Sequence, residues 1–148
     1  MTYQIRLENV PAQPTAVVRV QASQSELARV IPALCGEVWE FARNAKLPRP
    51  GRHLALYLDG AITLECGVEV TAPFAGSDRV VCSSTPAGLA ATTTHIGAYA
   101  ELGAAHRAIL DWCEQQGVRR AGPSWEVYGH WVEPPALPRT DVYYLLLS

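Results

Sequence analysis

The feature that most limits the fold of this chain is an internal repeat, because adding 71 to a position in the first half gives a related residue in the second. A repeat of this length is a whole supersecondary unit rather than a short solenoid module. Two such units that pack against each other leave a seam, and seams between similar halves are common places for a ligand cleft. The matching pairs include Val38 and Ile109, Arg49 and Arg120, Gly51 and Gly122, and Tyr57 and Tyr128.

One position breaks the repeat, because Ala55 in the first half corresponds to Glu126 in the second. Burying a carboxylate that is charged and unpaired is costly. Such a group in an aromatic cleft can donate or accept a proton as a general acid or base. Alternatively it can bind a cation, and each aromatic ring face then adds about 0.5–2 kcal/mol to the binding free energy of that cation. The alternative is a glutamate on an exposed strand face that bonds to a neighbouring arginine.

The bulk properties of the chain narrow the class of protein. Its 148 residues are enough for one domain with a sizeable core, and we expect a single domain over 1–148 with repeats at about 15–70 and 88–147. A net charge of −2, with no basic run and no helix-turn-helix pattern, argues against direct nucleic-acid binding. The first residues do not form a signal peptide, and no apolar run approaches the roughly 18 residues of a membrane span. We therefore expect a cytoplasmic protein without a membrane partner.

Each half is predicted to contain a strand, a helix and two further strands. In the first half, apolar residues recur at helical spacing from Leu27 to Ala45. Pro32 fits best at a first helical position, so the regular helix is expected to begin there after one irregular turn. Gly117 suits the C-terminal cap of the second helix. The predicted helices cover about 32–45 and 101–116, and the predicted strands cover about 3–10, 14–22, 53–58, 62–70, 89–95, 124–131 and 141–147.

Alternation along the predicted strands assigns their side chains to two faces of a sheet. The helices must bury their apolar stripes against one face, and we expect the face with Leu54, Leu56 and Trp125 to receive them. The sequence therefore predicts an α+β fold, a pseudo-twofold duplication of a β-α-β-β unit whose antiparallel sheet has helices on one face and a ligand groove on the other. Gly67 is expected to leave room there for a guest molecule. The groove residues are Tyr57, Glu65, Gly67, Glu126, Tyr128 and His130, with Trp131 at the rim.

Motifs for metals and nucleotides are missing from the sequence. None of the four cysteines forms a C-x-x-C pair, and the four histidines lack zinc spacing. The chain contains no P-loop, no G-x-G-x-x-G, no G-x-S-x-G and no H-E-x-x-H. We therefore expect no metal and no cofactor, with the cysteines as small buried hydrophobes.

Four segments together resemble the GyrI-like (gyrase-inhibitor-like) domain, also known as the AraC-type effector-binding domain. They are 122–128 (GPSWEVY), 140–144 (TDVYY), 64–70 (LECGVEV) and 95–99 (HIGAY). The resemblance implies two strand–helix–strand–strand halves around a groove that binds bulky, often aromatic and cationic molecules, with Glu126 in the groove. The chain departs from the family pattern at Glu69, where proline is often seen, and it lacks the helix-turn-helix that many members carry.

Three functions follow as hypotheses. The first is a free-standing protein that captures cationic amphipathic or planar aromatic compounds of the multidrug type. The second is a hydrolase of cyclopropanoid DNA-alkylating antibiotics, an activity that the resemblance implies because some stand-alone members of the family have it. In this hypothesis Glu126 and Tyr128 are the catalytic residues, which donate or accept protons. The third is an interaction module that binds DNA gyrase through its surface. For the first, the expected ligand-binding residues are Glu126, Tyr57, Tyr128, Glu65, Gly67 and Trp131.

Overall fold

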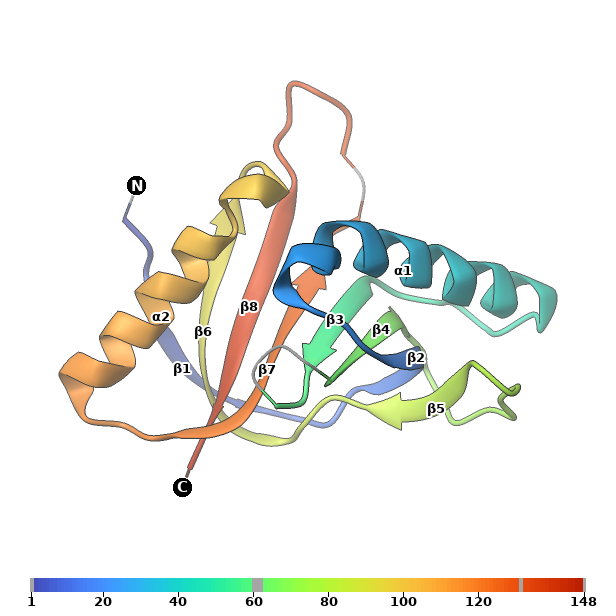
Figure 1. The fold of residues 1–148 in the computed structure, drawn as a ribbon, viewed down its shortest axis with the longest axis horizontal. Coiled ribbons are helices and arrows are strands. Elements are labelled where there is room, and N and C mark those ends of the chain that lie inside the picture. The colour runs from blue at the N-terminus through green and yellow to red at the C-terminus, as the bar shows by residue number, and fades with distance from the viewer. Residues whose placement is uncertain (1, 60–62, 131, 148) are drawn as a thin grey trace.

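The computed structural model describes residues 2–59, 63–130 and 132–147, which form one antiparallel sheet and two long helices (Figure 1). The predicted α+β class is confirmed. The strands are β1 (Arg6–Val10), β2 (Pro14–Gln21), β3 (His53–Tyr57), β4 (Thr63–Glu69), β5 (Val81–Ser84), β6 (Gly88–Ile96), β7 (Arg120–Tyr128) and β8 (Arg139–Leu146). The helices are α1 (Leu27–Asn44) and α2 (Gly103–Gln116), preceded by the 3-10 turns η1 (Gln24–Glu26) and η2 (Tyr99–Glu101).

The strand order relates the two halves by a pseudo-twofold rotation about one seam. Across the sheet the order is β1-β6-β8-β7-β3-β4-β2-β5, so β6-β8-β7 of the second half meets β3-β4-β2 of the first. The seam is the antiparallel pair of β3 and β7, in which Ala55 lies directly opposite Glu126. The position that breaks the sequence repeat is therefore paired with its own counterpart, at the centre of the arrangement.

Helix α1 begins earlier than the sequence indicated. The backbone N–H of Ser23 donates to Glu26 Oε1 at 2.8 Å, and this contact starts the η1 turn that leads into the helix at Leu27. Pro32 lies inside α1 and not at its start, so the expectation for Pro32 is wrong. A proline there removes one hydrogen bond to the preceding turn, and the buried apolar stripe that includes Val38 offsets this loss. Helix α2 ends as predicted, at Gly117 with φ of 67°.

Both faces of the sheet are buried, and this reverses part of the predicted assignment of faces. Helix α1 packs on Ala55, Tyr57 and the apolar residues of β4, among them Leu64. Leu54 and Leu56 point to the other face, where they form a separate core cluster with Trp125, Val127 and Ala90. Since β3 and β7 bury side chains on both of their faces, alternation alone does not show which side receives a helix.

The sheet is rolled toward a partial barrel, and the second core cluster fills the inside of the roll. Only residues 11–13 connect β1 to β2, although these strands are six places apart in the sheet. A flat sheet would separate them by about 29 Å, whereas this linker reaches about 15 Å. The short linker therefore brings the β1 end of the sheet near β2 (Figure 1). The hydrogen bond from the Thr85 backbone N–H to the Gln13 carbonyl, at 2.9 Å, continues the β2–β5 ladder into this linker. The concave face predicted as a groove is therefore occupied by the protein's own side chains.

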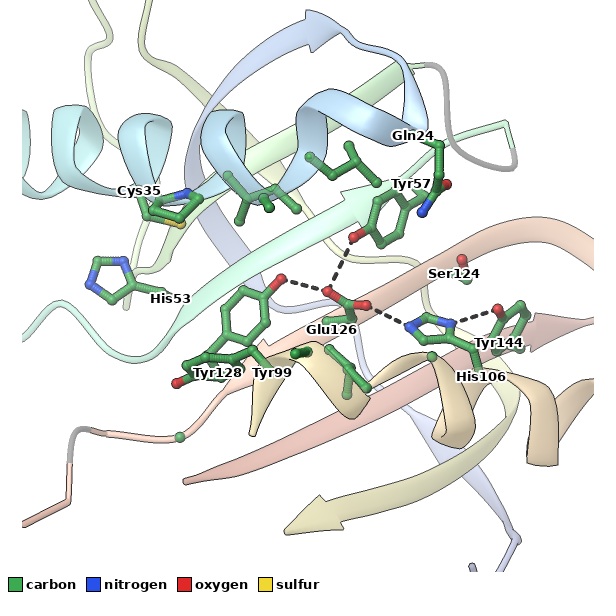
Figure 2. Close-up of a pocket in the computed structure, with 18 residues that line it drawn as sticks. Gln24, Cys35, His53, Tyr57, Tyr99, His106, Ser124, Glu126, Tyr128 and Tyr144 are labelled. Carbon is green, nitrogen blue, oxygen red and sulfur yellow. Dashed lines mark hydrogen bonds and ion pairs between the residues drawn. The ribbon is translucent and has the colours of Figure 1, made fainter. Parts of the chain in front are cut away.

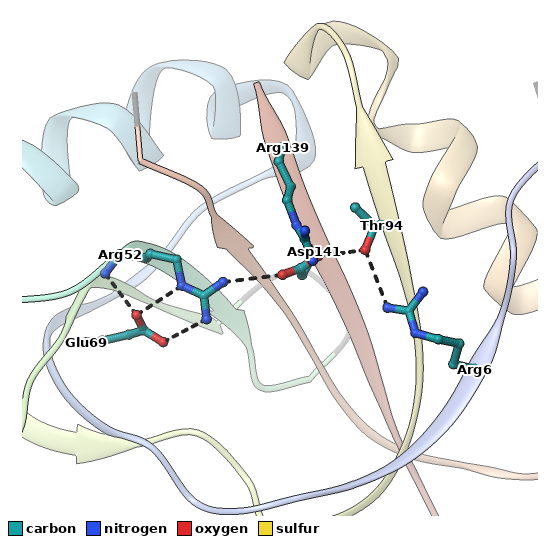
Figure 3. A network of polar contacts seen from close by, with 6 residues as sticks. All are labelled: Arg6, Arg52, Glu69, Thr94, Arg139 and Asp141. Carbon is teal, nitrogen blue, oxygen red and sulfur yellow. Dashed lines mark hydrogen bonds and ion pairs between the residues drawn. The ribbon is translucent and has the colours of Figure 1, made fainter. Parts of the chain in front are cut away.

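A polar network ties the two halves together at an edge of this concave face (Figure 3). Arg52 donates from Nε to Glu69 Oε1 at 3.2 Å and from Nη1 to Asp141 Oδ2 at 3.3 Å. Asp141 is 5% exposed and also accepts from Thr94 at 2.8 Å and from Arg139 at 3.2 Å. Glu69 thus holds the arginine that bridges the seam.

Candidate ligand-binding cavity

A cavity of about 960 Å³ lies between the two helices, above the seam of β3 and β7 (Figure 2). The groove was predicted on the side of the sheet without helices, and this location is wrong. The two helices lie on either side of the seam (Figure 1), and residues of both line the cavity. Its walls come from α1 (Leu27, Ile31, Cys35), from the sheet (His53, Tyr57, Ser124, Glu126, Tyr128, Tyr144) and from η2 and α2 (Tyr99, Leu102, His106).

Glu126 lies at the floor of the cavity, on the central strand β7. It is 5% exposed, and its two oxygens accept hydrogen bonds from both halves of the molecule. The hydroxyls of Tyr57 and Tyr128 both donate to Oε1, at 3.1 and 2.5 Å. These tyrosines are repeat-equivalent, so the duplication supplies two matched donors to one carboxylate. The carboxylate is therefore buried as predicted. It is hydrogen-bonded to protein side chains, however, whereas the sequence pattern predicts an unpaired group.

The third partner of Glu126 is His106, on the inward side of α2. Its Nε2 lies 2.5 Å from Glu126 Oε2, and its Nδ1 lies 2.7 Å from the hydroxyl of Tyr144 on β8. The three side chains form a chain from β8 through α2 to β7 (Figure 2). With the hydrogen on Nε2, the imidazole donates to the carboxylate and accepts from Tyr144, so each polar atom in the chain has a partner.

The tyrosines around Glu126 keep their protons. Burial, followed by the negative charge of Glu126, raises the pKa of Tyr57 and of Tyr128 well above the usual value. The same two causes raise the pKa of Tyr144 to about 12. A neutral phenol can donate a hydrogen bond, whereas a phenolate cannot. At ordinary pH the tyrosines therefore act as donors that stabilise a negative charge in a place with little water.

The structure brings together only part of the predicted ligand-binding set. Tyr57, Glu126 and Tyr128 converge on the cavity. Glu65 and Gly67 instead pair with Leu56 and Leu54, so they lie on the concave face. Glu65 is paired there with Arg19 and with the Ser83 hydroxyl, at 2.5 and 2.8 Å.

The predicted role of Gly67 in making room for a guest does not fit the backbone around it. A Cβ at Gly67 would lie 1.8 Å from the Ala16 carbonyl oxygen, so the missing side chain accommodates strand β2. Trp131 falls outside the described residues, and the neighbouring His130 is exposed and does not line the cavity.

Sequence reasoning missed His106 and Tyr144 as site residues. The signal for His106 was present, since a polar imidazole on an otherwise apolar helical stripe needs a partner inside the protein. Its repeat counterpart is Cys35 on α1, a thiol whose Sγ faces the carbonyl oxygens of Leu54 and Gly67 at 3.9 and 3.8 Å. Burial raises the pKa of the Cys35 thiol to about 11, so this side of the cavity is uncharged.

The cavity carries a single acidic residue among the described positions that line it, Glu126. No group of three or more metal-ligating side chains occurs in the part of the chain that the structure describes. Neither helix of these residues is long and apolar enough to cross a bilayer. The arrangement is suited to holding an apolar guest that carries positive charge, because aromatic walls and one anion converge on the same space.

Comparison with known proteins places the chain in a family. The model of the GyrI-like small molecule binding domain matches residues 3–146, and the chain belongs to this family of small-molecule-binding domains. The resemblance in the sequence is thereby confirmed. No curated protein gives a significant match to the sequence.

Several solved structures share the fold at low sequence identity. The C-terminal domain of EcmrR is 22% identical with a TM-score of 0.79, over 100% of this chain and 99% of that chain. SAV2435, solved with bound tetraphenylphosphonium, is 10% identical with a TM-score of 0.61, over 100% and 95%. A hydrolase from Listeria innocua is 11% identical with a TM-score of 0.60, over 97% and 92%.

Proposed function

We propose that this GyrI-like domain captures bulky aromatic cations in the cavity between α1 and α2, with Glu126 as the counter-charge. The observation that carries the proposal is a carboxylate, 5% exposed, held by Tyr57, Tyr128 and His106 inside a cavity of about 960 Å³. Two neutral tyrosines leave the negative charge in place while they satisfy its oxygens. An incoming cation meets that charge in a region of low dielectric, where the attraction is strong.

The walls of the cavity favour a ligand with aromatic groups. Tyr99 is 55% exposed at its edge, and its ring meets that of Tyr128 edge-to-face with centroids 5.8 Å apart. A cation over such rings gains about 0.5–2 kcal/mol per ring. The apolar residues Leu27, Ile31 and Leu102 add surface that excludes water. The tetraphenylphosphonium bound to SAV2435 is a ligand of this kind, which supports the choice of class.

A panel of cationic and neutral dyes tests the proposal by thermal shift. We expect several bulky cations to raise the melting temperature of the wild-type domain and to leave that of Glu126→Gln unchanged. A neutral aromatic compound should shift the melting temperature of both proteins equally. Glu65→Gln is a matched control, since Glu65 is a carboxylate 1% exposed on the other face of the sheet. Equal shifts by cations in the wild type and in Glu126→Gln would contradict the proposal.

Hydrolysis of a cyclopropanoid compound in the same cavity is the second candidate. The hydrogen-bonded pair of His106 and Glu126, at 2.5 Å, favours it because such a pair can move a proton to or from a bound molecule. The proposed catalytic residues are Glu126 and Tyr128. Mass spectrometry of a cyclopropanoid drug after incubation should then show a product heavier by one water. A product that forms equally fast with Glu126→Gln would rule out this mechanism.

A further inference from the structure

His106 is the one member of the cavity network whose two charge states can both be fully hydrogen-bonded. When the imidazole is neutral, Nε2–H donates to Glu126 Oε2 and Nδ1 accepts from the Tyr144 hydroxyl, at 2.5 and 2.7 Å. When it is protonated, Nδ1–H donates to the Tyr144 oxygen instead. The Tyr144 hydroxyl also has a hydrogen-bonding neighbour in the Ser124 side chain. Tyr144 can therefore reverse its role without leaving a buried polar atom unpaired.

Among the described residues that line the cavity, Glu126 is the only charged partner of His106. Beside it lie Glu126 and Tyr128 of β7 and Tyr144 of β8, and the far walls carry Tyr57 of β3, Tyr99 of η2 and Cys35 of α1. The Cys35 thiol and the hydroxyls of Tyr57, Tyr128 and Tyr144 all have a raised pKa and stay neutral. The second histidine of the cavity is His53, whose Nδ1 is buried without a partner among the described residues.

A fixed cation and a protonated His106 compete for the same carboxylate. The distance of 2.5 Å between Nε2 and Oε2 makes the imidazolium a contact ion pair with Glu126, and the net charge of the pair is then zero. A bulky cation that enters this neutral cavity meets a like charge beside its counter-charge. It binds well only when the pair carries a net charge of −1, which requires that His106 gives up its proton.

We propose that the cavity exchanges one proton on His106 for one cationic ligand, so that His106 acts as a resident counter-ion that the ligand replaces. The inference rests on the proposed binding of cations by Glu126. Charge balances in the exchange, because the protonated empty domain and the cation give the liganded domain with a neutral imidazole and one proton in solution. Imidazole is the side chain whose charge ordinarily changes between about pH 5 and 8. His106 therefore determines the charge of the ligand that the cavity accepts.

Isothermal titration calorimetry with tetraphenylphosphonium tests the exchange, because this ligand has no titratable group. The titration is repeated in buffers of different ionisation enthalpy from about pH 5.5 to about pH 8.5. We expect the wild-type domain to release up to about one proton per ligand at the acid end and none at the alkaline end. The dissociation constant should fall with rising pH by at most about tenfold per unit and then become constant.

Two variants identify the source of the proton. His106→Asn keeps a donor toward Glu126 but cannot change charge, and we expect it to bind tetraphenylphosphonium without proton release and with a dissociation constant independent of pH. His53→Asn removes the other cavity histidine, and the number of protons that it releases per bound ligand should equal that of the wild type, whatever its affinity. Release that persists in His106→Asn would overturn the proposal.

The outcome separates this inference from the proposed function. Wild-type binding without proton release at any pH would overturn the exchange and leave the capture of cations intact. Failure of the wild type to bind the cation at any pH would contradict the proposed function itself. Triphenylphosphine oxide, a neutral ligand of similar shape, should bind without a change in protonation, and release with this compound would also contradict the exchange.

Discussion

The two halves of the molecule share one fold but differ in chemistry at three corresponding positions. The second half places His106, Glu126 and Tyr144 in a hydrogen-bonded chain. Adding 71 relates Cys35 to His106 and Ala55 to Glu126. The strand registers relate Val68 to Tyr144, since Val68 pairs with His53 as Tyr144 pairs with Ser124. The first half therefore has a thiol, a methyl group and an isopropyl group where the second has an imidazole, a carboxylate and a phenol.

What the halves keep in common explains how the difference is tolerated. Tyr57 and Tyr128 are retained on both sides of the seam, and both donate to Glu126 Oε1. Ala55, directly opposite Glu126, is fully buried and leaves room for the carboxylate. The pseudo-symmetric backbone thus directs two hydrogen-bond donors to one position at the seam, and a single carboxylate there accepts from both. Two acids at the seam would repel each other.

The largest effect is expected from making the halves alike. In Ala55→Glu a second carboxylate lies opposite Glu126 without donors of its own, and leaving a buried charge unpaired costs about 3–5 kcal/mol. Urea denaturation should show this loss of unfolding free energy. The double variant Ala55→Glu/Glu126→Ala moves the acid to the other half, where Tyr57 and Tyr128 can still reach it. We expect it to be more stable than Ala55→Glu alone, and a double variant that is no more stable would show that the seam is not symmetric.

Alkaline pH should weaken both halves by a related mechanism. The Tyr144 pKa is raised from 10.0 to about 12 and the Cys35 pKa from 9.0 to about 11, in both cases mainly by burial. Below the unfolded values each group is protonated in both states. Between the two values only the unfolded chain has lost the proton, so stability falls by up to about 3 kcal/mol per group. Denaturation as a function of pH measures this loss of unfolding free energy. Compared with the wild type, the loss should be smaller between pH 9 and 11 in Cys35→Ala and smaller between pH 10 and 12 in Tyr144→Phe.

A smaller effect is expected when one donor of the matched pair is removed. Tyr57→Phe and Tyr128→Phe each leave Glu126 with one donor fewer at Oε1, which should cost about 1–3 kcal/mol of unfolding free energy. The bond from Tyr128 is the shorter, 2.5 Å against 3.1 Å, so Tyr128→Phe should cost at least as much as Tyr57→Phe. A double-mutant cycle with Glu126→Gln should show coupling for both tyrosines. Additive effects would mean that the hydroxyls do not act on the carboxylate.

Much of the fold could be predicted from the sequence, and the errors have physical causes. Alternation and the repeat predict every described strand except β5 (Val81–Ser84), which the sequence prediction missed, together with helix α2 and the exceptional Glu126. They did not reveal which face of β3 a helix covers, because the sheet rolls and buries both faces. The alternation predicts that Gly67 makes space for a ligand, whereas in the structure it accommodates the backbone of Ala16. The local preference of proline predicts a helix start at Pro32, because such a preference does not include the packing that keeps α1 continuous.

The site was harder to predict than the fold, because its partners come from different elements. The repeat alone predicts Tyr57, Glu126 and Tyr128, because Glu126 breaks the repeat at the position of Ala55 and the two tyrosines lie two residues further along in each half. His106 and Tyr144 reach Glu126 from α2 and β8, and nothing in local spacing joins these elements. Glu65 lies in an alternating strand pattern like that of Glu126, but its carboxylate forms an ion pair with Arg19 on the concave face of the sheet. Binding to DNA gyrase stays a prediction from the resemblance alone.

The most direct test of the central claim is the affinity for tetraphenylphosphonium of three proteins that differ in one carboxylate, measured by calorimetry at about pH 8. The claim is that Glu126, and no other buried acid of the described residues, supplies the counter-charge for the cavity. Glu126→Gln should therefore bind at least about tenfold more weakly than the wild type, and Glu65→Gln should bind as the wild type does. An unchanged dissociation constant in a folded Glu126→Gln would contradict the account.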